Sequence, residues 1–196
     1  MRNNITRILF FLLLICPGSA FAQGPAQRFD DRVLMDLQNN RTPLQTDIGL
    51  FLSKNYLYGD VGIPAGMFIG GVIDHNQALR QNSLFVASST AFSYGITFLI
   101  KTIVKRPRPF IQNINLVPVY RAGDYSFPSG HTSSTFATAT ALSMAYPKWY
   151  IIAPVFLWAG ATSYSRMYLG EHYPTDVGAG AVIGVGSALS MSFLKK

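Results

Sequence analysis

Long stretches without a charged residue divide the chain. They cover residues 61–73, 81–100, 132–147, 149–165 and 177–194. A helix needs about 20 mostly apolar residues to cross a bilayer, with a range of about 17–25, and flanking Tyr or Trp residues extend a shorter run into the interface. The Gly, Ala, Ser and Thr content of the stretches suits close helix packing in a membrane. The pattern therefore predicts an all-α bundle of about five membrane-spanning helices.

Residues 23–60 have a different pattern, in which charged and aliphatic residues alternate. This alternation predicts one or two amphipathic helices, broken near Pro43. The alternation is compatible with helices at the membrane interface. It is equally compatible with surface helices that pack on the bundle. We therefore expect a periplasmic or interfacial helical segment over 23–60 and a membrane-embedded domain over 61–196.

The N-terminus (residues 1–22) has the pattern of a secretory signal peptide. A positively charged start precedes an apolar run over 8–15, and small residues at 20 and 22 form a cleavage site. An uncleaved membrane helix is the alternative, although the run is short for one. Cleavage would remove Cys16, the only cysteine, so we expect no disulfide in the mature chain.

Composition favours a membrane protein over a soluble one. Hydrophobic residues make up 49% of the chain and charged residues only 13%, against about 25% charged residues in an average soluble domain. The net charge of +7 suits nucleic acid, a membrane surface or an anionic substrate. Nucleic acid is not an expected partner, because the chain has no basic helix, zinc-ligand spacing or interleaved basic and aromatic residues. A soluble bundle with buried central helices is the alternative.

Three groups of polar residues stand at the ends of the predicted spans. They contain Lys101 and Arg108, then Ser129, Gly130 and His131, and finally Arg166, His172 and Asp176. Phosphoryl transfer requires such a set. Cations neutralise the oxygens of the transition state, a base or nucleophile attacks, and an acid protonates the leaving oxygen.

The order of the spans places all three groups on one side of the bundle. Span 81–100 ends at the first group, and span 132–147 starts from the second. After a tight turn at Lys148 on the opposite face, span 149–165 returns to the third group, and span 177–194 leaves from it. The three groups should therefore converge.

The side on which they converge is expected to be the periplasm, because segment 23–60 follows the signal peptide and lies there too. Lys195 and Lys196 then lie in the cytoplasm, as the positive-inside rule prefers. Arg106 and Arg121 fall on the outer side against that rule. We expect both to make surface or headgroup contacts.

The three groups also resemble a known signature. Lys-x6-Arg-Pro, Pro-Ser-Gly-His and Ser-Arg-x5-His-x3-Asp, in this order, resemble the three motifs of the type 2 phosphatidic acid phosphatase superfamily. That superfamily includes membrane lipid phosphatases, secreted class A acid phosphatases and vanadium haloperoxidases. Every motif position is filled, and the resemblance covers about residues 80–195. Three complete motifs at matching helix ends are far more specific than one.

The resemblance implies a role for eight residues of these motifs, called here the eight matched residues. His172 would be the nucleophile that forms a phosphohistidine, and Asp176 would hold its other ring nitrogen. His131 would protonate the leaving oxygen. The phosphate-binding residues would be Lys101, Arg108, Ser129, Gly130 and Arg166. No metal or other cofactor is implied. Tyr168 and Tyr173 stand between matched positions, and we expect them to line the pocket.

The resemblance and the apolar spans together predict a lipid phosphatase of the bacterial inner membrane with a periplasmic active site. Its substrate would be undecaprenyl pyrophosphate, phosphatidylglycerol phosphate, phosphatidic acid or a phosphate of lipid A. The main alternative is a soluble periplasmic acid phosphatase, against which the apolar spans argue. A vanadate-dependent peroxidase is disfavoured by the short chain, and a non-catalytic headgroup-binding protein by the complete set of reactive residues. The sequence does not decide the oligomeric state.

Overall fold

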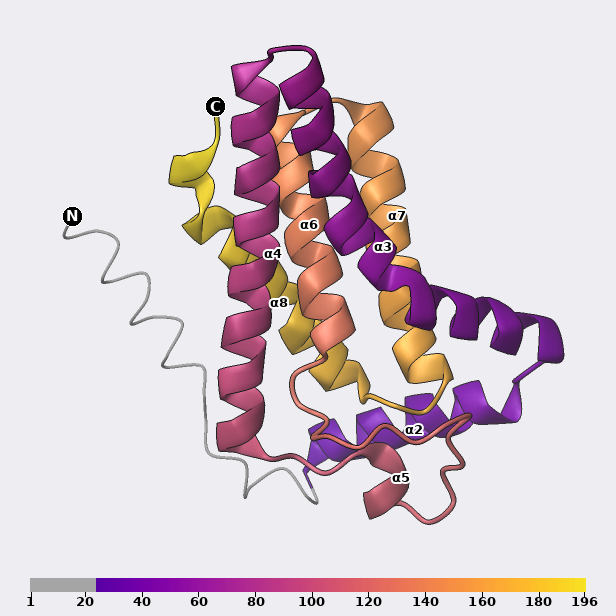
Figure 1. The fold of residues 1–196 in the computed structure, drawn as a ribbon. Helices are drawn as coiled ribbons and strands as arrows, with labels where there is room; N and C mark the ends of the chain where they lie inside the picture. The colour runs from indigo at the N-terminus through magenta and orange to yellow at the C-terminus, as the bar shows by residue number, and fades with distance from the viewer. Residues whose placement is uncertain (1–23) are drawn as a thin grey trace.

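The computed structural model describes residues 24–196, so the predicted signal peptide and Cys16 lie outside it. The described part is all-α (Figure 1). Its elements are α2 (Pro25–Asn39), α3 (Pro43–Ile73), α4 (Gln77–Val104), α5 (Pro109–Gln112), α6 (Gly130–Ala145), α7 (Trp149–Tyr168), α8 (Pro174–Ser190) and the short 3-10 helix η1 (Ser192–Leu194).

Five helices form the bundle, and α6 lies at its centre. Helix α6 contacts α3, α4, α7 and α8, and the buried residues of α6 are almost all Ser, Thr or Ala. Small side chains allow helix backbones to approach closely. The short side chains of α6 therefore explain how four neighbours can pack around one helix.

Within residues 24–196, three helices are long and apolar enough to cross a membrane, judged by length and composition. They cover Pro43–Ile73, Gln77–Gln112 and Pro174–Leu194. Helix α6 has 16 residues, fewer than the roughly 17–25 of a spanning helix. Because α6 is enclosed by other helices, it needs no apolar surface of its own. The expected five-helix bundle is therefore present, and three of its helices qualify as membrane spans.

The N-terminal segment joins the bundle through one continuous helix. Helix α2 ends at Asn39, and α3 begins at Pro43, which suits the first helical position. The Thr42 hydroxyl caps α3 by accepting a hydrogen bond from the Gln45 nitrogen at 3.3 Å. Helix α3 then runs uninterrupted to Ile73, so the division expected at residue 60 falls inside a helix.

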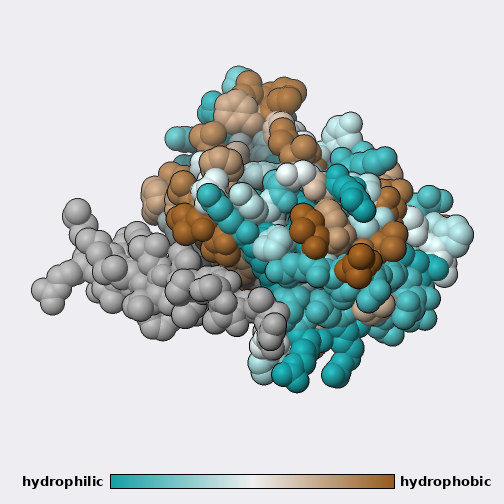
Figure 2. Space-filling model, turned by 90° about the horizontal axis from the view of Figure 1, so that it is seen from below, coloured by the Kyte–Doolittle hydropathy of each residue, from teal (hydrophilic) through white to brown (hydrophobic). Residues whose placement is uncertain are grey.

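Helix α2 crosses one end of the bundle, called here the site end (Figure 1). Helix α3 bends along its length so that its first part also projects at this end, and Pro64 inside α3 removes one helical hydrogen bond. Seen from below, hydrophilic residues gather over the site end, with hydrophobic residues among and around them (Figure 2). The C-terminus lies toward the opposite end (Figure 1).

The contact between α6 and α8 can be tested at Gly184. A β-carbon there would overlap the Ser133 carbonyl oxygen and come within 2.8 Å of the Ala137 nitrogen, both in the backbone of α6. Overpacking of this kind typically costs about 1–3 kcal/mol, so Gly184→Ala should lower the thermal unfolding temperature in detergent. The matched control is Gly178→Ala, because a β-carbon there meets nothing within 4 Å. Equal unfolding temperatures for the two variants would contradict the close α6–α8 contact.

Candidate active site

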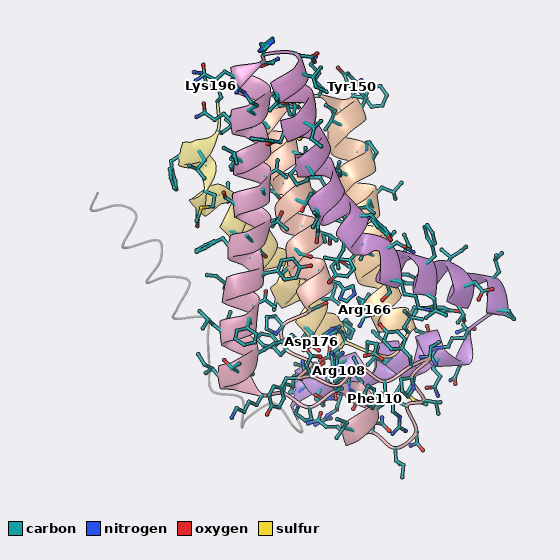
Figure 3. All side chains as sticks on the ribbon, in the orientation of Figure 1. Arg108, Phe110, Tyr150, Arg166, Asp176 and Lys196 are labelled. Atoms are coloured by element: carbon teal, nitrogen blue, oxygen red, sulfur yellow. The ribbon has the colours of Figure 1, made fainter. Side chains whose placement is uncertain are left out.

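The structure brings the eight matched residues to the site end from different elements. Lys101 lies near the end of α4, and Arg108 directly precedes α5. Ser129, Gly130 and His131 start α6, Arg166 lies near the end of α7, and His172 and Asp176 flank the start of α8. Figure 3 shows Arg108, Arg166 and Asp176 close to one another, whereas Tyr150 and Lys196 lie at the opposite end. The topology expected from the order of the spans therefore holds for the groups.

His172 is buried, with only 2% of its surface exposed. Its Nε2 lies 3.4 Å from Nη1 of Arg108, and its Nδ1 lies 3.6 Å from Oδ2 of Asp176. Burial, followed by the positive charges of Arg108 and Arg166, lowers the pKa of His172 well below its ordinary value. The imidazole is therefore uncharged near neutral pH and retains the lone pair that a nucleophile needs.

Asp176 is held beside His172 by three other groups. Its Oδ1 accepts a hydrogen bond from Arg106 at 2.6 Å. Its Oδ2 accepts hydrogen bonds from the Ser126 hydroxyl and from the Tyr173 backbone nitrogen at 2.9 Å. The 3.6 Å separation from His172 Nδ1 is too long for a hydrogen bond, and that nitrogen has no other partner. The carboxylate thus lies near the ring nitrogen without bonding to it in this state.

Arg106 is not the surface residue that the sequence led us to expect. Its side chain is only 14% exposed and forms ion pairs with Asp30 at 2.8 Å and with Asp176 at 2.6 Å. Its guanidinium lies 3.8 Å from the centre of the Tyr173 ring. Arg106 therefore ties α2 to the start of α8. No local pattern could reveal this contact, because its partners are far apart in the sequence.

The two tyrosines expected near the pocket hold the framework around it. The Tyr173 ring lies under Arg106, and its hydroxyl donates a hydrogen bond to Gln112 at 2.7 Å. The Tyr168 hydroxyl accepts a hydrogen bond from the Thr42 nitrogen at 2.8 Å. Tyr168 thereby fixes the start of α3 to the end of α7.

Lys101, Arg108 and Arg166 form a cation cluster that two further carboxylates neutralise. Glu171 Oε2 lies 3.0 Å from Arg108 and 3.8 Å from Arg166. The Asp124 carboxylate pairs with Arg108 and lies 3.0 Å from Lys101. The motifs contain neither acid, although an acidic residue directly before His172 was a signal available in the sequence.

The two carboxylates respond differently to the cations. Burial tends to raise the pKa of Asp124, but Lys101 and Arg108 outweigh this effect and lower it to about 2. Burial also raises the pKa of Glu171, and there Arg108 and Arg166 oppose the rise without reversing it. Asp124 is therefore firmly ionised, whereas Glu171 accepts a proton more readily than Asp124 does.

His131 and Arg166 meet at Ser53 of α3. The Ser53 carbonyl oxygen lies 3.1 Å from His131 Nε2, and the Ser53 hydroxyl accepts a hydrogen bond from Arg166. The Tyr120 hydroxyl accepts a second bond from Arg166. The Tyr56 ring lies 3.9 Å from the ring centre of His131. Sequence reasoning missed Ser53, because an isolated serine in an amphipathic stretch carries no motif.

Among the described residues, no three His, Cys, Asp or Glu side chains are arranged to hold a metal ion. A cavity of about 400 Å³ lies away from the cation cluster, beside α2 and α5. It is lined by Gln27, Asp31, Gln112, Asn113 and Ile114.

The model of one protein family, the PAP2 superfamily, matches residues 82–195. The chain belongs to the PAP2 superfamily. The match covers all eight matched residues and confirms the family that the three motifs indicated.

Relatives and a solved structure agree with this assignment. The chain is 40% identical over 76 residues to the lipid A 4'-phosphatase of Bacteroides thetaiotaomicron, covering 39% of this chain and 34% of that protein. It is 31% identical over 110 residues to undecaprenyl-diphosphatase BcrC of Bacillus subtilis, covering 56% of each. These matches span about a third and just over half of the two relatives.

The fold is similar to the crystal structure of a transmembrane PAP2 type phosphatidylglycerolphosphate phosphatase from Bacillus subtilis. The TM-score is 0.74 at 21% identity, over 98% of this chain and 96% of that one. At this identity the likeness shows the fold, and it confirms the all-α bundle as a PAP2 transmembrane fold.

The anchoring role of Arg106 can be tested by Arg106→Gln. Removing one partner of a buried ion pair costs about 3–5 kcal/mol, and we expect the low end of this range because Arg106 is 14% exposed. Thermal unfolding in detergent should show the loss, and proteases should cleave α2 faster. The matched control is Arg32→Gln, because Arg32 is exposed on α2. Equal stability of the two variants would contradict the anchor.

Burial of a neutral His172 predicts a pH dependence of stability. The pKa of His172 is lowered in the folded protein, whereas the unfolded chain binds a proton near the ordinary value of 6.5. The contribution of His172 to the free energy of unfolding is therefore fully present above pH 6.5. Below pH 6.5 the free energy of unfolding falls, by up to about 1.4 kcal/mol per pH unit. Between pH 7 and 5, the unfolding temperature of the wild-type chain should fall more than that of His172→Gln, whose amide does not titrate. Parallel curves would contradict a buried neutral imidazole.

Proposed function

We propose that this protein is a metal-independent phosphatase that removes phosphate from membrane lipid phosphates or pyrophosphates through a phosphohistidine on His172. The observation that carries the proposal is the buried imidazole of His172 with its Nε2 3.4 Å from Nη1 of Arg108, where burial lowers the pKa of the ring. A neutral nucleophile next to a cation cluster suits attack on an anionic phosphate, because the cations offset the charge of the incoming group.

The first step would form one bond and break one. Nε2 of His172 attacks phosphorus, and the bond from phosphorus to the leaving oxygen breaks. His131 gives a proton to that oxygen. The phosphoryl oxygens bind the cation cluster and the backbone nitrogens at the start of α6, where the helix dipole favours anions. Asp176 stabilises the positive charge that develops on the His172 ring from the Nδ1 side.

The second step would restore the enzyme. Water attacks the phosphorus atom of the phosphohistidine, and His131 takes the proton that the water loses. The bond between phosphorus and Nε2 breaks, and orthophosphate leaves. Both steps use the same residues in opposite protonation states, as acid–base catalysis by one side chain requires.

The position of the site supports a lipid substrate. Large apolar side chains are exposed on α3 near the site, among them Leu44, Ile48 and Phe51, and exposed apolar surface of this extent is typical of membrane contact. We propose that α3, α4, α6, α7 and α8 span the bacterial inner membrane and that α2 lies on the periplasmic surface. The relatives' names, lipid A 4'-phosphatase and undecaprenyl-diphosphatase, point to the same substrate class.

The deciding experiment measures phosphate release by detergent-purified protein in EDTA. The panel contains undecaprenyl pyrophosphate, phosphatidylglycerol phosphate, phosphatidic acid, lipid A and small water-soluble phosphates. We expect release from lipids that falls by about 10⁴-fold or more in His172→Ala, since a covalent nucleophile is lost. The control is His75→Asn, because His75 is exposed in the turn between α3 and α4 and has a positive φ, which asparagine tolerates.

The other outcomes separate the alternatives. Release from small phosphates alone would favour an acid phosphatase. Unchanged turnover in His172→Ala would remove His172 as the nucleophile. No release from any substrate would overturn the phosphatase proposal.

A further inference from the structure

The two carboxylates that neutralise the cation cluster are held very differently. Glu171 is fully buried, with 0% of its side chain exposed, whereas Asp124 is 56% exposed. Asp124 lies in the loop between α5 and α6, where no regular helix holds it, and its neighbours Gly123 and Tyr125 are also exposed. Asp124 can therefore move away without opening the core, and Glu171 cannot.

Asp124 occupies the donors of Arg108 that a phosphate would use. Nη1 of Arg108 already donates to the Glu171 carbonyl oxygen at 2.7 Å and to the Glu171 carboxylate at 3.0 Å. The remaining edge of the guanidinium, Nε and Nη2, donates to the backbone oxygen of Asp124 at 2.9 Å and to its carboxylate. A guanidinium binds phosphate best through two parallel bonds from one edge. Such binding requires Asp124 to leave.

Lys101 leads to the same conclusion. Its ammonium group lies 3.0 Å from the Asp124 carboxylate and also donates to the Tyr125 backbone oxygen. Its side chain is only 12% exposed, so the loop covers most of its charge. Two of the three cations that would bind phosphate are thus already paired with one carboxylate of the chain itself.

Protonation does not release Asp124. Because Lys101 and Arg108 lower its pKa to about 2, the carboxylate stays ionised throughout the pH range in which an enzyme works. Exchange with another anion is therefore the way to free the two cations. A carboxylate tethered beside the cations by its own chain has an effective concentration of about millimolar or above, so it competes with every anion that reaches the site.

We propose that Asp124 is an exchangeable counter-ion that determines specificity, because a phosphate must displace it from Lys101 and Arg108 to bind. This inference rests on the proposed function. A phosphodiester carries one negative charge, as Asp124 does. Replacing Asp124 with a phosphodiester therefore adds no attraction to Lys101 and Arg108. A phosphomonoester or terminal pyrophosphate carries more charge and more free oxygens. The competition therefore excludes the phosphodiester headgroups of ordinary membrane lipids and admits terminal phosphates.

The test is Asp124→Asn, which keeps the shape of the side chain and removes its charge. Isothermal titration calorimetry on the detergent-purified full chain would measure binding of orthophosphate and of dimethyl phosphate, a soluble phosphodiester. We expect orthophosphate to bind Asp124→Asn about threefold tighter or more than it binds the wild-type chain. This is the size of effect expected for the loss of two partly exposed ion pairs. We also expect dimethyl phosphate to bind measurably to the variant and not to the wild-type chain. Asp47→Asn is the matched control, because Asp47 is exposed on α3.

Two results would overturn the inference. Weaker orthophosphate binding by Asp124→Asn would mean that Asp124 orients Arg108 for phosphate, and unchanged binding would mean that it does not compete. Asp124→Ala provides a second variant if the first unfolds, as thermal unfolding would show. Because calorimetry needs no turnover, this test is separate from the phosphatase assay. A chain that behaves as expected here but releases no phosphate would contradict the proposed function alone.

Discussion

The carboxylate of Asp176 is the contact on which the arrangement of the site depends. It receives hydrogen bonds from Arg106, the Ser126 hydroxyl and the Tyr173 backbone nitrogen, so the α5–α6 loop and the start of α8 meet at one buried group. The backbone oxygen of the same residue accepts a bond from the Ser129 nitrogen at 3.1 Å, which joins the start of α6 to α8. The relative positions of His172, His131 and the cations follow from this junction.

A second constraint is the burial of positive charge. Arg108 and Arg166 are only 3% and 1% exposed, and isolated buried charges are strongly destabilising. Glu171 lies between them and offsets both charges. The charge that prepares the site for an anionic phosphate would otherwise oppose folding. The fold therefore keeps Glu171 buried between the two arginines, in a cluster whose three cations still outnumber its two carboxylates.

The sequence predicted the parts of the site that local patterns encode. Helix ends, motif spacing and the alternation of span directions were sufficient to bring residues as distant as Lys101 and Asp176 to one end of an all-α bundle. Contacts between α2 and the site were not predictable, because Arg106 finds Asp30 only after the chain folds. The surroundings of α6 were not predictable for a related reason. Its environment is other helices, and a charge-free stretch does not reveal which surroundings it has.

Helix α3 links the lipid-facing surface to the reacting groups. Tyr58 and Val61 are 77% and 60% exposed on this helix, whereas Ser53, one to two turns earlier, contacts both His131 and Arg166. A change in the tilt of α3 would therefore move the partner of His131 and the partner of Arg166 together. Under the proposed function, a lipid chain packed against α3 contacts the same helix that positions the acid. Helix α3 then couples recognition of the apolar part of the substrate to protonation of its leaving oxygen. A small soluble phosphate has no apolar chain to contact α3 and does not benefit from this coupling.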